Sequence, residues 1–250
     1  MMALPGAGYK LSSIWYNDVN GRQVPFTYDF NMPASDVVIT AVFTPITGGE
    51  IALPANFLNS ADSTTITTIE NEIAKITVPA NMLSNIPGSD GSSAAITVAA
   101  VNKATLPIET QALIGDRPVI DLGLTVNGNM TQWNNPDAPV SVCIPYSPTA
   151  EELLNPDSIV VYYIDGAGNL NCITNGHYDP DERSVTFQTT HFSIYAVGYN
   201  TKSYIDVPSD SWYSKAVQFI TAREITKNIN GMDASTFMPD LPISRGQFII

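Results

Sequence analysis

The chain has 250 residues and carries 24 Asp and Glu against 11 Lys and Arg, which gives a formal net charge of −13. Binding to nucleic acid requires a basic stripe, which so acidic a chain lacks. We therefore expect no nucleic-acid partner. The sequence has no run of 18 apolar residues, and we therefore expect no membrane insertion. No motif predicts a metal site or a cofactor, and the two cysteines, Cys143 and Cys172, leave their pairing open.

Residues 1–45 are predicted to form a small β unit. Apolar and polar residues alternate at 9–16 and 37–43, and residues 18–21 form a turn signal after the first of these strands. Residues 30–37, with the sequence FNMPASDV, then resemble the Met-Pro-Ala-x-Asp-Val signature of internalin-type surface repeats. That resemblance implies a spacer or adhesion module. A generic β-hairpin unit would behave in almost the same way.

Residues 46–200 are predicted to form a larger β domain. Short apolar runs rich in β-branched and aromatic residues alternate with turn residues, a pattern that favours a β sandwich. The predicted strands are 96–101, 119–126, 140–145, 159–164, 170–174, 184–190 and 192–199. The clearest turns lie at 165–169 and 178–182, and Glu151 and Glu152 are expected to begin a short helical turn.

The motifs at 144–146, 160–165, 185–187 and 190–197 also resemble a known β domain. It often precedes S-layer homology (SLH) modules in surface proteins of Gram-positive anaerobes. The resemblance covers about residues 75–200 and implies no active site, so no catalytic residue is expected.

The tripeptide His191-Phe192-Ser193 raises a minor alternative, autoproteolysis. The same tripeptide is cleaved in the autoproteolytic domains of nucleoporins and death-domain adaptors. Here Ser193 would attack the Phe192 carbonyl with His191 as the base. Strand alternation explains these residues more simply, because it puts Phe192, Ile194 and Ala196 on one face and His191, Ser193 and Tyr195 on the other.

Residues 204–250 resemble an SLH module, because the motifs at 204–207 (YIDV), 211–213 (SWY), 237–240 (FMPD) and 243–246 (ISRG) occur in that family's order. The resemblance implies a helix-loop-helix unit that binds secondary cell-wall polysaccharide non-covalently. That polymer is anionic and often carries a pyruvate ketal. The implied polysaccharide-binding residues are Asp206, Trp212, Ser244, Arg245 and Gly246.

The residues predict two helices in this module. In the first, Trp212, Ala216, Phe219 and Ile220 form an apolar stripe expected to face inward, and residues 209–211 supply capping side chains. A second helix is expected after Ser244, because Ser244 and Gln247 form a capping box, with Arg245 in the first turn.

The module departs from the family pattern in three places. Gln247 stands where glutamate is usual, Glu224 stands where glycine is common, and the loop 227–232 is longer than usual. Because the sequence stops at Ile250 and SLH modules usually work in sets of three, further modules are expected beyond it. Residues 1–6 lack the features of a secretory signal, so an export signal is expected upstream.

Taken together, these patterns predict a mainly β fold that combines a small β-repeat unit, a β-sandwich-like domain and a partial helical SLH module. The leading hypothesis is a non-enzymatic fragment of an extracellular protein of the bacterial cell wall or S-layer. An alternative is the anchoring and spacer region of an extracellular polysaccharide hydrolase. A third is adhesion by the β domains themselves.

Overall fold

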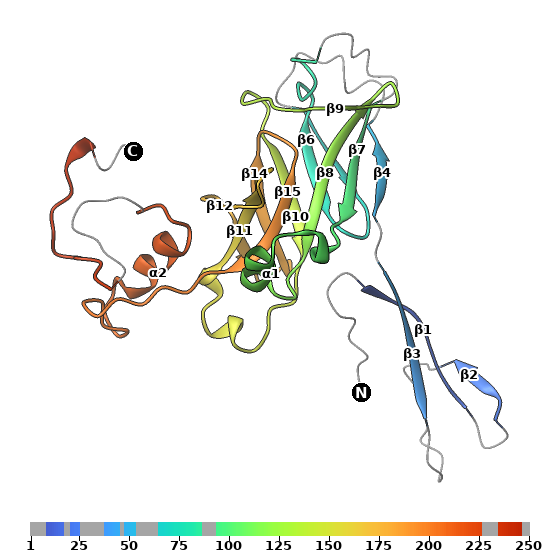
Figure 1. The fold of residues 1–250 in the computed structure, drawn as a ribbon, viewed down its shortest axis with the longest axis horizontal. Coiled ribbons are helices and arrows are strands. Elements are labelled where there is room, and N and C mark those ends of the chain that lie inside the picture. The colour runs from blue at the N-terminus through green and yellow to red at the C-terminus, as the bar shows by residue number, and fades with distance from the viewer. Residues whose placement is uncertain are drawn as a thin grey trace.

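The computed structural model describes residues 9–17, 21–25, 38–45, 48–53, 65–86, 94–226 and 235–246. These residues form three antiparallel sheets and short helices, so the predicted mainly β fold is confirmed (Figure 1). The internalin-like motif at 30–37 lies outside the described residues.

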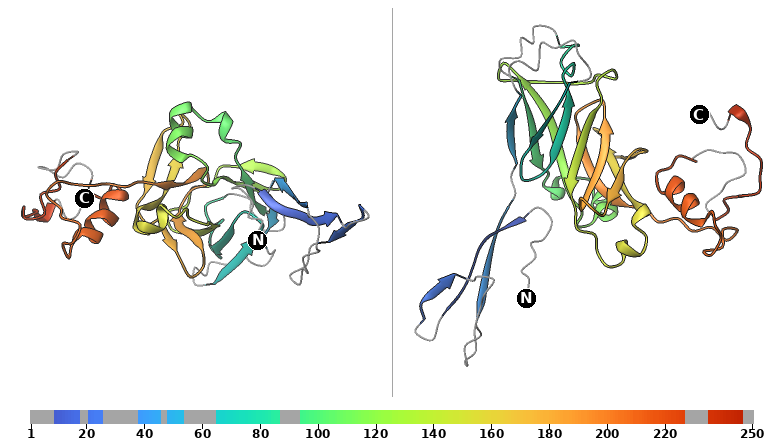
Figure 2. Two further views of the ribbon diagram at one scale, coloured as in Figure 1. Left: turned by 90° about the horizontal axis from the view of Figure 1, so that it is seen from below. Right: turned by 180° about the vertical axis from the view of Figure 1, so that it is seen from behind.

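The first sheet is built from the N-terminal part of the chain. Its strand order is β2-β1-β3, with bounds β1 Tyr9–Asn17, β2 Gln23–Pro25 and β3 Ile39–Pro45. The register of β1 against β3 shifts between Leu11 and Ser13, which is typical of a β-bulge. This sheet extends away from the rest of the molecule in every view (Figures 1 and 2).

The other two sheets form a sandwich. One has the order β13-β14-β10-β6-β5, with bounds β5 Ile66–Glu70, β6 Lys75–Pro79, β10 Val140–Pro145, β13 His177–Asp179 and β14 Ser184–Thr189. The other has the order β12-β11-β15-β8-β7-β4, with β9 beside β8. Its bounds are β4 Gly49–Ala52, β7 Ala94–Ala100, β8 Val119–Val126, β9 Asn129–Thr131, β11 Ile159–Ile164, β12 Leu170–Ile173 and β15 Ile194–Tyr199.

A single apolar core fills the space between these two sheets. Burial alternates along β6 and β10, so each strand turns one face inward, as expected where the other face meets solvent. Helix α1, Ile108–Ile114, packs against β15 and buries Ile114 beside Val119, Ile164 and Ala196 in a second, smaller cluster. The seven-stranded sheet is therefore covered on part of its outer face as well.

The predicted strands 119–126, 140–145 and 159–164 match β8, β10 and β11 residue for residue. The last strand differs, because β15 begins at Ile194 and Phe192 lies before it. Phe192 packs on Trp133, with ring centroids 4.5 Å apart, against the main core. Ile194 and Ala196 belong to the α1 cluster, so the predicted face shared with Phe192 is wrong.

Both predicted turns join antiparallel strands and are closed by aspartates. The Asp165 carboxylate accepts the backbone N–H groups of Ala167 and Asn169 at 2.9 and 2.8 Å. Asp179 does the same for two residues of the β13–β14 turn. These Asx-type bonds pre-form the hairpins.

The two cysteines do not form a disulfide, since Cys143 lies on β10 and Cys172 on β12 of the opposite sheet. Within the described ranges, no group of three or more His, Cys, Asp or Glu side chains is placed to hold a metal ion. No described helix is long and apolar enough to span a membrane.

The remaining helical elements lie in the connections and in the C-terminal segment. They are the 3-10 helices η1 Lys103–Thr105, η2 Glu152–Leu154 and η3 Pro156–Ser158, and the α-helix α2 Ser214–Ala222.

Candidate functional site

Asp206 joins the two ends of the C-terminal segment. Its carboxylate accepts the backbone N–H of Phe237 at 2.9 Å and that of Met238 at 2.6 Å. Tyr204 packs on Phe237 with ring centroids 5.6 Å apart. Met238 has a left-handed backbone, with φ of 59°, which these hydrogen bonds help to hold. The YIDV and FMPD motifs, more than 30 residues apart, therefore form one structural unit.

Helix α2 begins later than the sequence predicts. Its N-cap is Tyr213, which makes no side-chain capping bond. The Ser211 hydroxyl instead donates to the Pro208 carbonyl at 2.7 Å and closes the turn ahead of the helix. The predicted cap at 209–211 is therefore wrong.

The predicted inward face of α2 is also wrong. The buried residues of the helix are Ser214, Val217, Thr221 and Ala222. By contrast, Trp212 is 93% exposed and Ala216 and Phe219 are exposed too, while Ile220 is half-buried. The Thr221 hydroxyl donates to the Val217 carbonyl at 2.7 Å, so it can be buried without an unsatisfied polar group.

Arg223 lies at the C-cap of α2, and the sequence patterns did not indicate its role. It is 1% exposed and lies against the sandwich. Its guanidinium donates to the carbonyls of Gly176 at 2.8 Å, Asp157 at 2.7 Å and Phe219 at 3.1 Å. Nothing local in the sequence distinguishes Arg223 from an exposed arginine, because two of these acceptors lie 47 and 66 residues away.

Glu224 follows with a left-handed backbone, at φ of 55°. The N–H of Ile225 bonds to the carbonyl of Ile220 at 3.0 Å, and that of Glu224 bonds to Thr221 at 3.1 Å. These two bonds define a Schellman motif, in which glycine is the usual residue at the left-handed position. The structure therefore explains why glycine is common there in the family that this segment resembles.

The five residues predicted to bind polysaccharide fall into two groups. Trp212, Ser244, Arg245 and Gly246 are exposed, whereas Asp206 is half-buried and bonded to backbone. Arg245 and Gly246 have helical backbone, as expected for the start of a second helix, but Gln247 and the predicted capping box lie partly outside the described residues.

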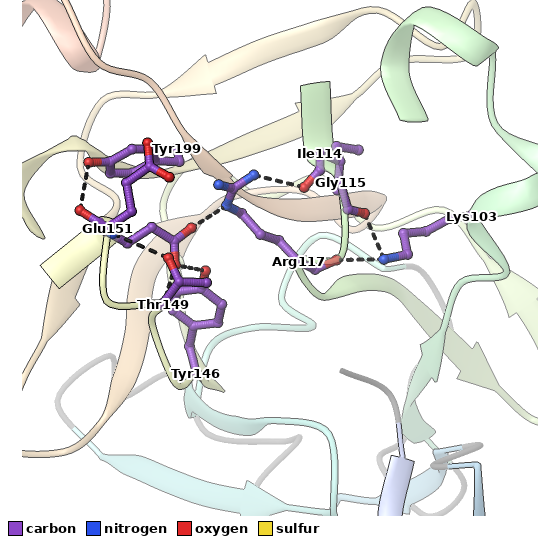
Figure 3. A network of polar contacts seen from close by, with 9 residues as sticks. Lys103, Ile114, Gly115, Arg117, Tyr146, Thr149, Glu151 and Tyr199 are labelled. Atoms are coloured by element: carbon purple, nitrogen blue, oxygen red, sulfur yellow. Dashed lines mark hydrogen bonds and ion pairs between the residues drawn. The ribbon is translucent and has the colours of Figure 1, made fainter. Parts of the chain in front are cut away.

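A second polar cluster lies at the end of the sandwich (Figure 3). Glu152 is 2% exposed, and its carboxylate accepts from Arg117 Nε at 2.6 Å, the Tyr146 hydroxyl at 2.7 Å and the Thr149 N–H at 2.8 Å. The Thr149 hydroxyl accepts the Glu152 N–H at 3.2 Å, which completes a capping box on the turn that leads into η2.

The charge state of Glu152 follows from these partners. Burial alone would raise the pKa of its carboxyl, but the hydrogen bonds from Tyr146, Thr149 and Arg117 outweigh it and hold the pKa below its usual value. Burial, with the Glu152 hydrogen bond next in size, raises the pKa of the Tyr146 hydroxyl. The cluster is thus a buried ion pair whose carboxylate is hydrogen-bonded to Arg117, Tyr146 and Thr149. Such a satisfied ion pair is a structural arrangement.

The geometry around Ser193 gives the autoproteolytic alternative no support of its own. Phe192 and Ser193 have neither a cis peptide bond nor a left-handed backbone, two forms of strain that could drive such cleavage. The His191 ring packs edge-on against Tyr163, with centroids 4.9 Å apart. Intact-mass analysis tests the alternative, since one species of 26.9 kDa rejects cleavage and two fragments support it.

The fold and this segment define a β-rich protein with a small helical module at its C-terminal side. Residues 203–249 match the family model of the S-layer homology domain. This chain therefore contains an SLH domain, as the motifs at 204–246 predict, and SLH domains associate proteins with the cell surface or S-layer.

A stretch of 173 residues is 26% identical to an amylopullulanase of Thermoanaerobacterium thermosulfurigenes. The alignment covers 64% of this chain but only 9% of that enzyme. Because the aligned stretch is far longer than the SLH match, the similarity extends into the β region. The internalin-type resemblance of residues 30–37 stays a prediction.

Proposed function

We propose that this chain is a non-enzymatic, wall-anchoring region of a secreted surface or S-layer protein. In this proposal the SLH domain binds an anionic secondary cell-wall polysaccharide, and the β units act as spacer or adhesion modules. The observation that carries it is the SLH match at 203–249, within which Trp212 and Arg245 are exposed.

The exposed side chains suit this ligand chemically. A guanidinium offers a planar fork of N–H donors that pairs with a carboxylate, such as that of a pyruvate ketal, in two parallel bonds. Arg245 is proposed to make this contact, with Ser244 and Gly246 beside it. The exposed indole of Trp212 offers an apolar face and one N–H donor to a sugar ring.

Asp206 is proposed to act indirectly. Both of its carboxylate oxygens accept backbone N–H groups of the 237–238 segment, so it can position that segment without touching a sugar. The charge distribution also favours this end of the chain as the anchor. Residues 204–250 hold five acidic and four basic residues, whereas 46–203 hold sixteen and five, which would repel an anionic polymer.

The test is a titration of the isotope-labelled chain with purified pyruvylated wall polysaccharide, followed by NMR. Arg245→Ala should weaken binding about 10- to 100-fold, because a charge-assisted pair is lost. Trp212→Ala should weaken it as well, and removal of the pyruvate groups should reproduce the Arg245→Ala effect. Lys215→Ala is the matched control, because Lys215 is an exposed cation on α2 and its loss changes net charge equally.

Unchanged affinity in both Arg245→Ala and Trp212→Ala would rule out the proposed contacts. An equal loss in Lys215→Ala would mean that only overall charge matters. No shift of any SLH resonance with the polymer would reject wall binding by this chain.

The similarity to an amylopullulanase favours a second candidate, the anchoring and spacer region of an extracellular polysaccharide hydrolase. The complete reading frame discriminates between the two. A catalytic domain elsewhere in that frame, with hydrolysis of α-glucans by the full-length protein, would support the hydrolase. A frame with no such domain would reject it.

A further inference from the structure

Arg223 belongs to the SLH segment by sequence but contacts the β sandwich through most of its donors. The acceptors on the sandwich are the carbonyls of Gly176, in the turn before β13, Asp157, in η3, and Ile159, at the start of β11, the last at a longer 3.4 Å. The fourth acceptor, Phe219, lies on α2 itself. One side chain therefore ties α2 to two places on the sandwich, the junction of η3 with β11 and the turn before β13.

Burial of the Arg223 guanidinium is tolerated only if its N–H donors have acceptors. Removing a guanidinium from water costs several kcal/mol unless its donors are satisfied. Here carbonyl oxygens satisfy them, and the Phe219 ring lies 3.6 Å from the guanidinium carbon as a cation–π partner. Burial lowers the pKa of Arg223 and Asp157 opposes this, but arginine starts so far above neutrality that it stays charged.

Asn200 makes a second, independent contact between the sandwich and α2. Its side-chain amide donates to the carbonyl of Ala222, in the last turn of α2, at 2.7 Å. Its backbone N–H donates to the Ser158 carbonyl at 2.9 Å, so the residue directly after β15 is fixed to η3. The carbonyls at the C-terminal end of α2 thus receive donors from the sandwich and from Arg223, where the helix dipole favours positive charge.

We propose that Arg223 is a positioning residue that makes the β sandwich a structural part of the SLH unit, so that α2 has one fixed orientation on the sandwich. The sandwich then sets the direction in which Trp212, two residues before α2, faces the surroundings. A nine-residue helix is marginal alone, so the docking surface also supplies much of its stability. This inference holds whether or not the SLH domain binds polysaccharide, because it concerns the free chain.

Residual dipolar couplings of the whole labelled chain test the orientation directly. In the wild type, the amides of α2 and of β10 should fit one alignment tensor. Arg223→Met keeps the apolar stem but removes the guanidinium, so the α2 couplings should shrink and need a second tensor. Arg223→Lys should be intermediate, because one ammonium cannot replace the three guanidinium nitrogens that donate here.

Arg183→Met is the matched control, since Arg183 is exposed on the β13–β14 turn. In this variant the couplings of α2 and β10 should still fit one alignment tensor.

Hydrogen exchange gives a second readout. The Nε–H of Arg223 should exchange slowly and that of Arg183 fast, and α2 amides should exchange about 10- to 100-fold faster in Arg223→Met while β10 is unchanged. Melting of α2 with an intact sandwich would also support the proposal. Unreduced couplings in a single tensor for Arg223→Met would overturn it.

Discussion

Glu224 occupies a backbone conformation that disfavours its own side chain. A left-handed residue other than glycine costs roughly 1 kcal/mol, and the Schellman bonds force that conformation here. We expect Glu224→Gly to raise the free energy of unfolding by about 0.5 to 1 kcal/mol, measured by urea denaturation. Glu224→Ala removes the same carboxylate but keeps the strain. If the glycine variant were no more stable than the alanine variant, the backbone explanation would fail.

Residue roles were predictable only where the cause is local. The unusual residue at position 224 and the Thr-x-x-Glu pattern at 149–152 are both visible in the sequence and both have structural counterparts. The burial of Glu152 and Arg223 was not predictable. Glu152 pairs with Arg117, 35 residues away, and Arg223 bonds to Gly176, 47 residues away. Only the folded chain brings these partners together.

At the scale of elements, Asp206 links the YIDV turn to the FMPD segment. Asp206→Ala removes both acceptors, and hydrogen bonds to a charged group contribute about 1.5 to 3 kcal/mol. We therefore expect the amides of Phe237 and Met238 to exchange about 10- to 100-fold faster, measured by hydrogen exchange with NMR detection. Asp210→Ala, at an exposed aspartate nearby, should leave both rates unchanged. Equal rates in both variants would contradict the linking role.

Helix α2 shows why an apolar stripe can mislead. The stripe beginning at Trp212 is real in the sequence, but the helix docks through Val217 and small hydroxyl residues instead. Serine and threonine can be buried when their hydroxyls bond to the helix backbone, as Thr221 does. Periodicity gives the existence of a helix, whereas the face that it buries depends on the surface available to it.

At the scale of the whole molecule, the Glu152 cluster connects the two sheets of the sandwich. Tyr146 directly follows β10 of one sheet and Arg117 shortly precedes β8 of the other. The folded pKa of Glu152 lies below its unfolded value near 4.5. Its stabilisation is therefore complete above about pH 5 and is lost as the pH falls through the folded pKa.

Glu152→Gln should therefore lower the free energy of unfolding by about 3 kcal/mol at pH 7, because Arg117 loses its buried partner. The difference from wild type should shrink as the pH falls from 5 towards 3, measured by urea denaturation at each pH. Glu151→Gln, at the exposed neighbour, should follow the wild type throughout. A pH-independent difference would show that packing, and not the charge of Glu152, is responsible.

The sandwich was the most predictable part of the molecule. Strands β8, β10 and β11 carry dense runs of β-branched residues between clear turns, so their bounds follow from the sequence. Which sheet each strand joins was not predictable. The pairing of β10 with β6 and of β15 with β8 spans long separations and is set by packing of the common core.

The strand directions also decide how tension would pass through this molecule. From β4 to β15 every neighbouring pair is antiparallel, so the start of β4 and the end of β15 lie at the same end of the seven-stranded sheet (Figure 1). The N-terminal sheet is attached at the first point and the SLH domain at the second. A pull between the SLH domain and the N-terminal sheet would therefore act across the three strand ladders from β4 to β15 and peel them apart in turn.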